Sequence, residues 1–167
     1  MNKGVIYAGD LQIYSAPAAL ISHVEWAINQ HLGVVQSFRW LKQPVSPGSY
    51  GLEMQWRSRD SMAPKLALSL KSWKLIRFEL RESDQRNSEG VLFRCTPDLG
   101  LHQVSINPIG EVVINENQIK SLIADSIGVK KLVNTLENAI GVEWDRELEP
   151  FRIALAEGNQ HSLSQIG

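Results

Sequence analysis

Two short stretches of the chain alternate strictly between apolar and polar residues, and this alternation constrains the fold most. Residues 50–57 carry Tyr, Leu, Met and Trp at every second position, and residues 76–81 do the same with Ile, Phe and Leu. Because successive side chains of a β-strand point to opposite faces, a period of two predicts strands with one apolar and one charged face. We therefore expect a sheet whose apolar face is covered by other elements.

Two segments with apolar residues at helical spacing lie between the predicted strands. They cover about residues 17–32, ending at Gly33, and about residues 60–73, with Asp60 or Ser61 as the candidate N-cap. Further strands are predicted at residues 34–41 and at residues 5–14, where Gly9 and Asp10 indicate either a bulge in one strand or the turn of a small hairpin. The resulting order, βαββαβ, is the split βαβ arrangement of ferredoxin-like folds, in which two helices cover one sheet face.

The second half of the chain reads as a β-meander followed by helices. Strands are predicted at residues 91–95, 101–106 and 111–114, joined by turn-forming segments at residues 97–100 and 107–110. Asn115 and Gln118 resemble a capping box that begins two short helices, which end at Gly141. We thus expect an α+β fold: a ferredoxin-like βαββαβ core extended by an antiparallel β-meander and C-terminal helices. One domain would span residues 1–153, with a flexible tail over residues 154–167.

Composition narrows the classes of protein to consider. Hydrophobic residues make up 43% of the 167 residues, enough for one core, and 17 basic against 18 acidic residues leave no overall field that attracts nucleic acids or membranes. No apolar run reaches the length of about 20 residues that a membrane helix needs, and no signal sequence is visible, so we expect a cytoplasmic protein. A lone cysteine and four scattered histidines favour neither a metal site nor a disulfide, and we expect no cofactor.

Cys95 and His102 are the candidates for a catalytic pair. A two- or four-residue loop within residues 97–100 would place them directly opposite each other, with Cβ atoms about 4.5–5.5 Å apart. A neighbouring imidazolium favours a reactive thiolate, so one alternative function is a small cysteine-dependent enzyme. The same register surrounds Cys95 with an apolar row, which favours an inert, buried cysteine. The sequence does not decide whether the chain is an enzyme, and it favours a non-enzymatic role.

A second alternative is DNA binding through the C-terminal helix pair. Residues 122–131 resemble the turn of a helix-turn-helix, whose second helix would present Lys130, Lys131, Asn134 and Thr135. Against this, Asn134 falls where the motif places an apolar residue, and from residue 111 onward nine acidic residues outnumber five basic ones. An ordinary α-hairpin is the preferred interpretation, and nucleic acid is not the favoured partner.

The charged face of the predicted sheet is the most informative surface, because it is rich in arginine. Such a face could be solvated, could hold an anion, or could accept the acidic and aromatic run at residues 143–151 from the same chain or from a neighbour. The candidate binding residues are Arg39, Arg57, Arg77, Arg81, Trp144, Asp145, Glu147 and Glu149. The leading hypothesis is therefore a non-enzymatic interaction or regulatory domain that uses these two elements, as a homo-oligomer or with another protein.

Five stretches carry a family resemblance: residues 15–20 (SAPAAL), 23–27 (HVEWA), 77–79 (RFE), 96–100 (TPDLG) and 144–152 (WDRELEPFR). Together they resemble an actinobacterial family of domains of unknown function, number 3145. The resemblance spans about residues 11–153 and is most specific around Trp26 and over residues 144–152. It implies a cytosolic actinobacterial protein, and it brings no known activity, substrate or catalytic residue.

Overall fold

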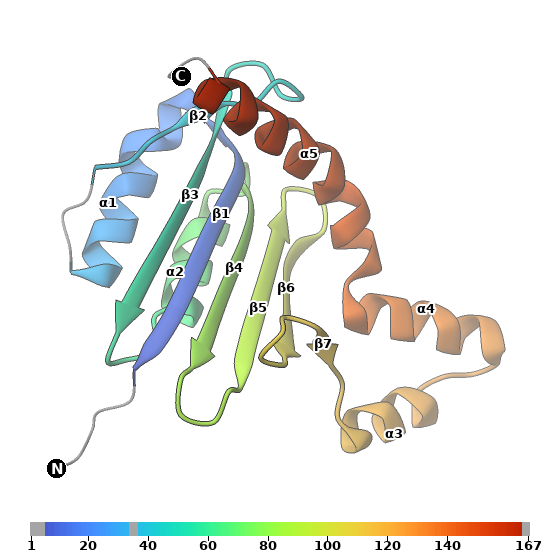
Figure 1. Ribbon diagram of the computed structural model, residues 1–167. Helices are drawn as coiled ribbons and strands as arrows, with labels where there is room; N and C mark the ends of the chain where they lie inside the picture. Colours follow the sequence, from blue (N-terminus) through green and yellow to red (C-terminus); the bar gives the residue numbers. More distant parts are fainter. Residues whose placement is uncertain (1–5, 34–36, 165–167) are drawn as a thin grey trace, which may run out of the picture.

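The computed structural model describes residues 6–33 and 37–164, which form one antiparallel sheet with helices on both of its faces (Figure 1). The strands are β1 Tyr7–Pro17, β2 Leu41–Lys42, β3 Ser49–Ser58, β4 Arg77–Asp84, β5 Gly90–Thr96, β6 Gly100–Ile106 and β7 Val112–Val113, in the spatial order β2-β3-β1-β4-β5-β6-β7. The helices are α1 Ile21–Leu32, α2 Ala63–Ser72, α3 Glu116–Ala124, α4 Val129–Ile140 and α5 Val142–Ser164, with a 3-10 turn at Ala18–Leu20. The predicted α+β class is confirmed, while the ferredoxin-like comparison stays a prediction.

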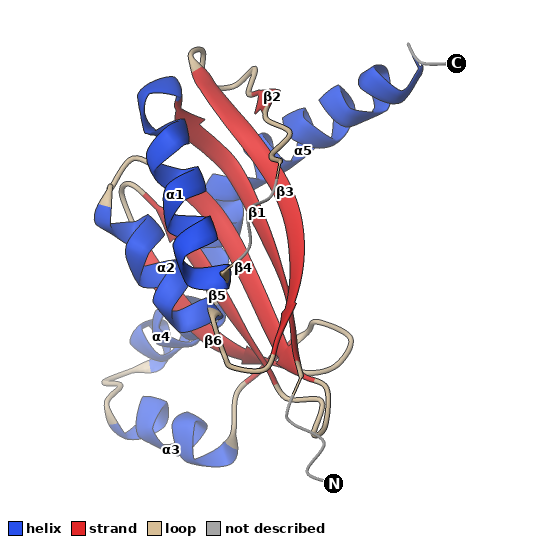
Figure 2. Ribbon diagram, turned by 90° about the vertical axis from the view of Figure 1, so that its left-hand side faces the viewer, coloured by secondary structure: helices blue, strands red, loops and turns tan. Residues whose placement is uncertain are grey.

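The main hydrophobic core lies between the sheet and helices α1 and α2, which cover the same face (Figure 2). The alternating residues of β3 and β4, among them Leu52, Trp56, Phe78 and Leu80, point into this core. The opposite face, here called the polar face, carries the residues between them and is crossed by α5 (Figure 1). A smaller apolar cluster of Tyr14, Leu148, Phe151 and Leu155 packs α5 onto that face.

A bulge in β1 prepares the polar face for α5. The residues from Ile13 to Ala16 on β1 oppose only Leu52 to Tyr50 on β3, so β1 contains one extra residue there. A bulge places two consecutive residues on one face of a strand. Tyr14 and Ser15 accordingly both form hydrogen bonds on the polar face. The Tyr14 hydroxyl donates to Glu79, and the Ser15 hydroxyl accepts from Arg77. The sequence left open a bulge or a hairpin around Gly9 and Asp10. The structure has one strand that is regular at these two residues and bulges further along, between Ile13 and Ala16.

Two helix ends follow the sequence signals and one does not. Gly33 ends α1 in the left-handed conformation, and Asn115 and Gln118 form the predicted capping box of α3. Helix α2, in contrast, has neither Asp60 nor Ser61 as its N-cap. Its first amides, those of Met62 and Ala63, donate to the buried carboxylate of Glu82 on β4, at 2.8 and 3.1 Å. A carboxylate from a neighbouring strand thus replaces a local cap.

The C-terminal half differs from the prediction in the length of its last helix. Helix α5 continues to Ser164, so residues 154–164 of the predicted tail are helical.

In the first half of the chain, the predicted strand at residues 34–41 is much shorter than expected. Only Leu41 lies in β2, and residues 34–36 are outside the described part of the chain. Helices α3 and α4 stand beside the sheet as a hairpin, beyond β7 (Figure 1). Within the described ranges, no helix combines the length and the apolar character that crossing a membrane would require.

Candidate functional site

The acidic and aromatic start of α5 lies on the polar face of its own sheet. Glu147 forms an ion pair with Arg77 of β4, at 3.4 Å. The guanidinium carbon of Arg77 lies 4.4 Å from the centre of the Phe151 ring, so the same arginine also makes a cation–π contact with α5. Arg77 therefore contacts α5 in two ways, through the ion pair with Glu147 and through the cation–π contact with Phe151.

Glu79, the next residue of β4 on this face, is the centre of an ion-pair network. It is only 6% exposed, yet it accepts hydrogen bonds from the Tyr14 hydroxyl at 2.5 Å and from Arg94 Nε at 3.4 Å. Arg152 of α5 donates to both of its oxygens, at 2.5 and 3.2 Å. A buried carboxylate needs such partners because removing it from water is costly. Burial and the Glu79 charge together raise the pKa of Tyr14, so this hydroxyl keeps its proton.

Asp145 of α5 is the fifth member of the network. Its Oδ1 lies 2.8 Å from Arg152 Nη2 and 3.3 Å from Arg94 Nε. Although burial alone would lower the pKa of Arg152, its contacts with Glu79 and Asp145 raise it overall. The ion-pair network thus consists of Tyr14, Glu79, Arg94, Asp145 and Arg152, and it joins β1, β4 and β5 to α5. The remaining acidic candidate, Glu149, pairs with Arg152 at 3.1 Å on the exposed side of the helix.

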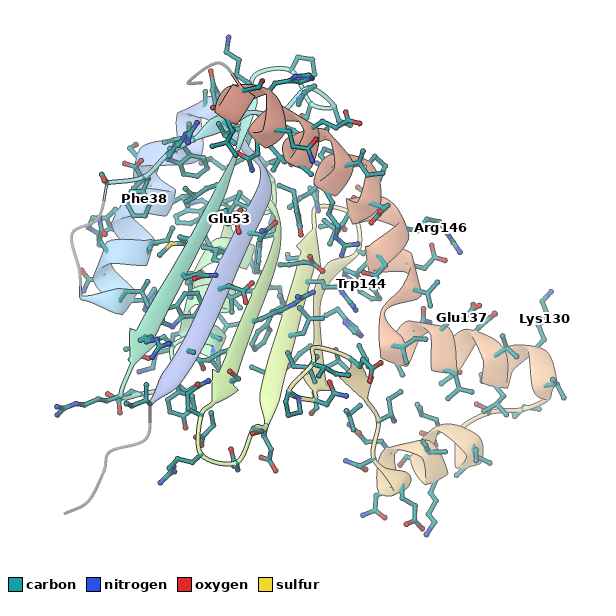
Figure 3. All side chains as sticks on the ribbon, viewed as in Figure 1. Phe38, Glu53, Lys130, Glu137, Trp144 and Arg146 are labelled. Atoms are coloured by element: carbon teal, nitrogen blue, oxygen red, sulfur yellow. The ribbon has the colours of Figure 1, made fainter. Side chains whose placement is uncertain are left out.

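Trp144 fixes the beginning of α5 against β6. The side chain of Trp144 lies between the start of α5 and the sheet (Figure 3). Its indole nitrogen donates to the carbonyl of Gly100 at 3.0 Å, and its ring centre lies 4.7 Å from that of His102. His102 Nε2 in turn lies 3.0 Å from the carbonyl of Ala139, near the end of α4, and the nearby Ile140 carbonyl accepts from Arg94 at 2.9 Å. Burial lowers the pKa of His102. The junction between α4 and α5 is therefore held by side chains of β5 and β6.

The four predicted arginines have different surroundings. Arg77 pairs with α5 as described, and Arg39 donates to the Ser162 hydroxyl near the end of the same helix. Arg57 and Arg81 are exposed and make neither a hydrogen bond nor an ion pair with any residue that the structure describes. The acidic run thus lies on the part of the polar face near Arg77, and it leaves the part near Arg57 and Arg81 uncovered.

The predicted facing of Cys95 and His102 is wrong. The partner of Cys95 across β5 and β6 is Leu101, and His102 lies opposite Arg94. Thr96 pairs with Gly100, so the loop has three residues and the register differs by one from that of a two- or four-residue loop. Cys95 points into the main core, 3% exposed, where burial raises the pKa of its thiol to about 11. His102 points to the opposite face.

Four network members are absent from the predicted binding residues: Tyr14, Glu79, Arg94 and Arg152. For Glu79 the alternation of residues 76–81 predicts the correct face of the sheet. Tyr14 reaches the polar face only because of the bulge, which alternation cannot locate. Arg152 had a usable signal, since it follows Asp145 and Glu149 by seven and three residues and so shares one helix face with them. Arg94 lies between Phe93 and Cys95 on β5, a strand that is buried on both faces. Because residues on both faces are buried, the sequence of this strand does not alternate clearly between apolar and polar residues.

Two open hollows lie on the polar face beside α5, with volumes of about 340 and 460 Å³. They share Gln12 and Arg152, and Glu53 lines the first (Figure 3). Asp10, which lines the second, has its pKa raised by burial, although the neighbouring Arg81 opposes this shift. Among the described residues, no group of three His, Cys, Asp or Glu side chains is placed to hold a metal ion.

Helices α3 and α4 pack on each other as an α-hairpin, and α4 also packs on α5. Neither helix contains a buried residue. Lys130 and Lys131, the contacts of the less favoured DNA-binding alternative, are exposed at the start of α4. The Thr135 hydroxyl donates to the Lys131 carbonyl of the same helix. Ile127 and Val129, at the tip of the hairpin, are 84% and 78% exposed.

Fold and site together define a small α+β domain whose polar sheet face is tied to its own C-terminal helix by an ion-pair network. The chain belongs to the family described as protein of unknown function (DUF3145), which matches residues 10–165. This match confirms the family resemblance of the sequence. Neither a curated protein nor a solved structure is similar enough to match the chain.

Proposed function

We propose that this protein is a non-enzymatic interaction domain that presents the α3–α4 hairpin to a protein partner. The observation that carries the proposal is the set of exposed aliphatic residues on the hairpin, here called the aliphatic row. It consists of Ile119, Ile123, Ile127, Val129, Val133 and Ile140, which are 39–84% exposed. Scattered apolar residues on a surface are normal, whereas a concentration of them on two adjacent helices is typical of an interaction site.

The ion-pair network serves this function by fixing the hairpin. The chain enters α5 directly after α4, and Arg94 and His102 bond to the last carbonyls of α4. Arg152 and Asp145 then hold α5 to the sheet. We interpret the charge complementarity between the polar face and the acidic segment as an internal contact that sets the position of the hairpin. Arg57 and Arg81 remain available for contacts with a partner.

The polar side chains argue for binding over catalysis. The thiol of Cys95 is buried with a raised pKa, and the acids of the network are engaged with arginines. We further propose a cytoplasmic location and an actinobacterial source. The lone cysteine and the near-neutral composition support the location, and the sequence resemblance supports the source.

A photo-crosslinking amino acid at position 127 tests the proposal in cells that produce the full chain. We expect one discrete covalent adduct, to another protein or to a second copy. The same probe at Leu68, which is 61% exposed on α2, is the matched control and should give none. Equal, diffuse labelling from both positions would contradict the proposal.

A stability measurement separates a contact surface from a part of the fold. Val133→Ser should change the free energy of unfolding of dilute protein by no more than about 0.5 kcal/mol, as is usual for surface positions. Ile28→Ser, in the main core, should be strongly destabilising because it buries a hydroxyl and leaves a cavity. A large loss for Val133→Ser would show that the row serves folding instead.

A further inference from the structure

The apolar residues of α4 have the spacing of a helix-pairing seam. Val129, Val133, Leu136 and Ile140 follow one another at intervals of four, three and four residues. Intervals of three and four keep side chains on one stripe of a helix, as in the a and d positions of coiled coils. Leu136 is half-buried against its own chain, whereas the other three are exposed. The stripe therefore lacks a complete covering within the described chain.

The charges that flank this stripe favour another copy of the same helix. Lys130 and Glu137 lie seven residues apart, so they are on the same side of the stripe, Lys130 in the first turn of α4 and Glu137 about one turn before its end (Figure 3). Neither forms an ion pair with a residue that the structure describes. When two such helices lie antiparallel, the lysine end of each meets the glutamate end of the other. Residues at these flanking positions select partners and orientation in coiled coils.

The hairpin as a whole is electrically balanced, which argues against a strongly charged partner. From residue 116 to residue 140 it carries three lysines and three acidic residues. A nucleic acid or an acidic peptide would gain little from such a surface. A second copy brings an equal aliphatic row and the same charges in the reverse order, as a two-fold interface requires.

We infer that the partner of the hairpin is a second copy of this chain, bound through antiparallel pairing of α4 about a two-fold axis near Val133 and Leu136. In this arrangement Val129 of one copy packs against Ile140 of the other. Lys130 of each copy pairs with Glu137 of the other, and α3 flanks the seam. The inference rests on the proposed function, because it names the partner of the same surface.

Light scattering of the full chain as a function of concentration tests the inference. We expect a mass of twice 18.7 kDa at high concentration. Val133→Asp should give a monomer, because a carboxylate would be buried in the seam. Lys130→Glu and Glu137→Lys should each raise the dimer dissociation constant roughly tenfold, which corresponds to about 1.4 kcal/mol. Lys131→Glu, on the side of α4 opposite the seam, is the matched control and should leave the constant unchanged. Circular dichroism verifies that each variant is folded.

The charge exchange provides the decisive variant. Lys130→Glu combined with Glu137→Lys recreates both pairs in the reverse order, so it should restore the dissociation constant. A monomeric wild-type chain, or a double variant as weak as the single ones, would overturn the inference. If the wild-type chain is monomeric and position 127 still crosslinks to a different protein, only the inference fails. Loss of that crosslink as well would remove the proposed function.

Discussion

At the scale of single residues, burial decides which polar groups can act. Tyr14, Glu79 and Arg94 are all nearly inaccessible on the polar face, yet each has a partner of complementary chemistry. Cys95 is also buried, but the residues around it in the main core are apolar and offer its thiol no charged partner. The same sheet thus stabilises charged groups on one face and suppresses the ionisation of a thiol on the other.

The Tyr14 hydroxyl should contribute measurably to stability. Its hydrogen bond goes to a buried carboxylate, and bonds to charged groups contribute about 1.5–3 kcal/mol. We expect Tyr14→Phe to lower the free energy of unfolding in urea by that amount. Tyr50→Phe, on β3 and half-buried, is the control and should cost much less. Equal losses of unfolding free energy in the two variants would show that the hydrogen bond from Tyr14 to Glu79 does not stabilise the fold.

Cys95 should be unreactive in the folded protein. Because the chain has one cysteine, labelling with a thiol reagent near neutral pH reports on this residue alone. We expect slow labelling of native protein and rapid labelling after denaturation, since only the thiolate reacts and burial raises the pKa to about 11. Rapid labelling of the native chain would revive the alternative of a cysteine-dependent enzyme.

His102 should make stability depend on pH on the acidic side of neutrality. Burial lowers its pKa, so the unfolded chain takes up a proton more readily than the folded one. Its contribution to stability is complete above its ordinary pKa of about 6.5 and is lost as the pH falls through the lower folded value. The loss of unfolding free energy between pH 7.5 and 5.5 should be smaller in His102→Gln than in the wild type. His161→Gln, at an exposed position, is the control for replacing a histidine elsewhere in the chain.

At the scale of elements, the junction of α4 and α5 is the most constrained position. Gly141 has a φ of +84°, and a Cβ atom there would lie 2.4 Å from Arg94 Nη1 and 2.8 Å from His102 Cε1. The glycine is thus needed both for its left-handed backbone and for the close approach of two side chains. The hairpin and α5 can keep their relative position only if this space stays empty.

Replacing this glycine separates the two effects. Gly33 ends α1 in the same left-handed conformation, but a Cβ atom there would meet nothing within 4 Å. Gly33→Ala should cost about 1–2 kcal/mol, the usual penalty of that conformation. We expect Gly141→Ala to cost more in urea unfolding and to expose the start of α5 to protease. Equal costs would show that Arg94 and His102 can move aside.

At the scale of the whole molecule, ion pairs between the polar face and α5 hold the helix on the sheet. Arg77→Glu would replace an attraction to Glu147 by a repulsion, so α5 should loosen from the sheet. Chymotrypsin should then cleave at Phe151 faster than in the wild type. Arg57→Glu, on the same face without an ion pair among the described residues, is the matched control. Arg77→Glu combined with Glu147→Arg should restore resistance; if it does not, the charge pair is not what holds the helix.

Sequence periodicity was enough to predict most elements, but it was insufficient for the site. The facing of Cys95 and His102 failed because one residue in the loop length inverts every side chain of the following strand. The position of Tyr14 depended on a bulge, and the N-terminus of α2 depended on Glu82 from a strand that follows it. Each of these features is decided by a contact between distant parts of the chain, which local patterns do not record.

The sequence alone determined what depends on neighbouring residues: the alternating strands, the amphipathic helices, the glycine at the end of α1 and the capping box of α3. It also showed that an arginine-rich face and an acidic segment have complementary charges. Only the tertiary structure decided that the two meet within one chain and that the aliphatic row of α3 and α4 remains exposed. The physical reason is that burial and charge pairing depend on distances across the fold, whereas periodicity fixes only the direction of each side chain from its own element.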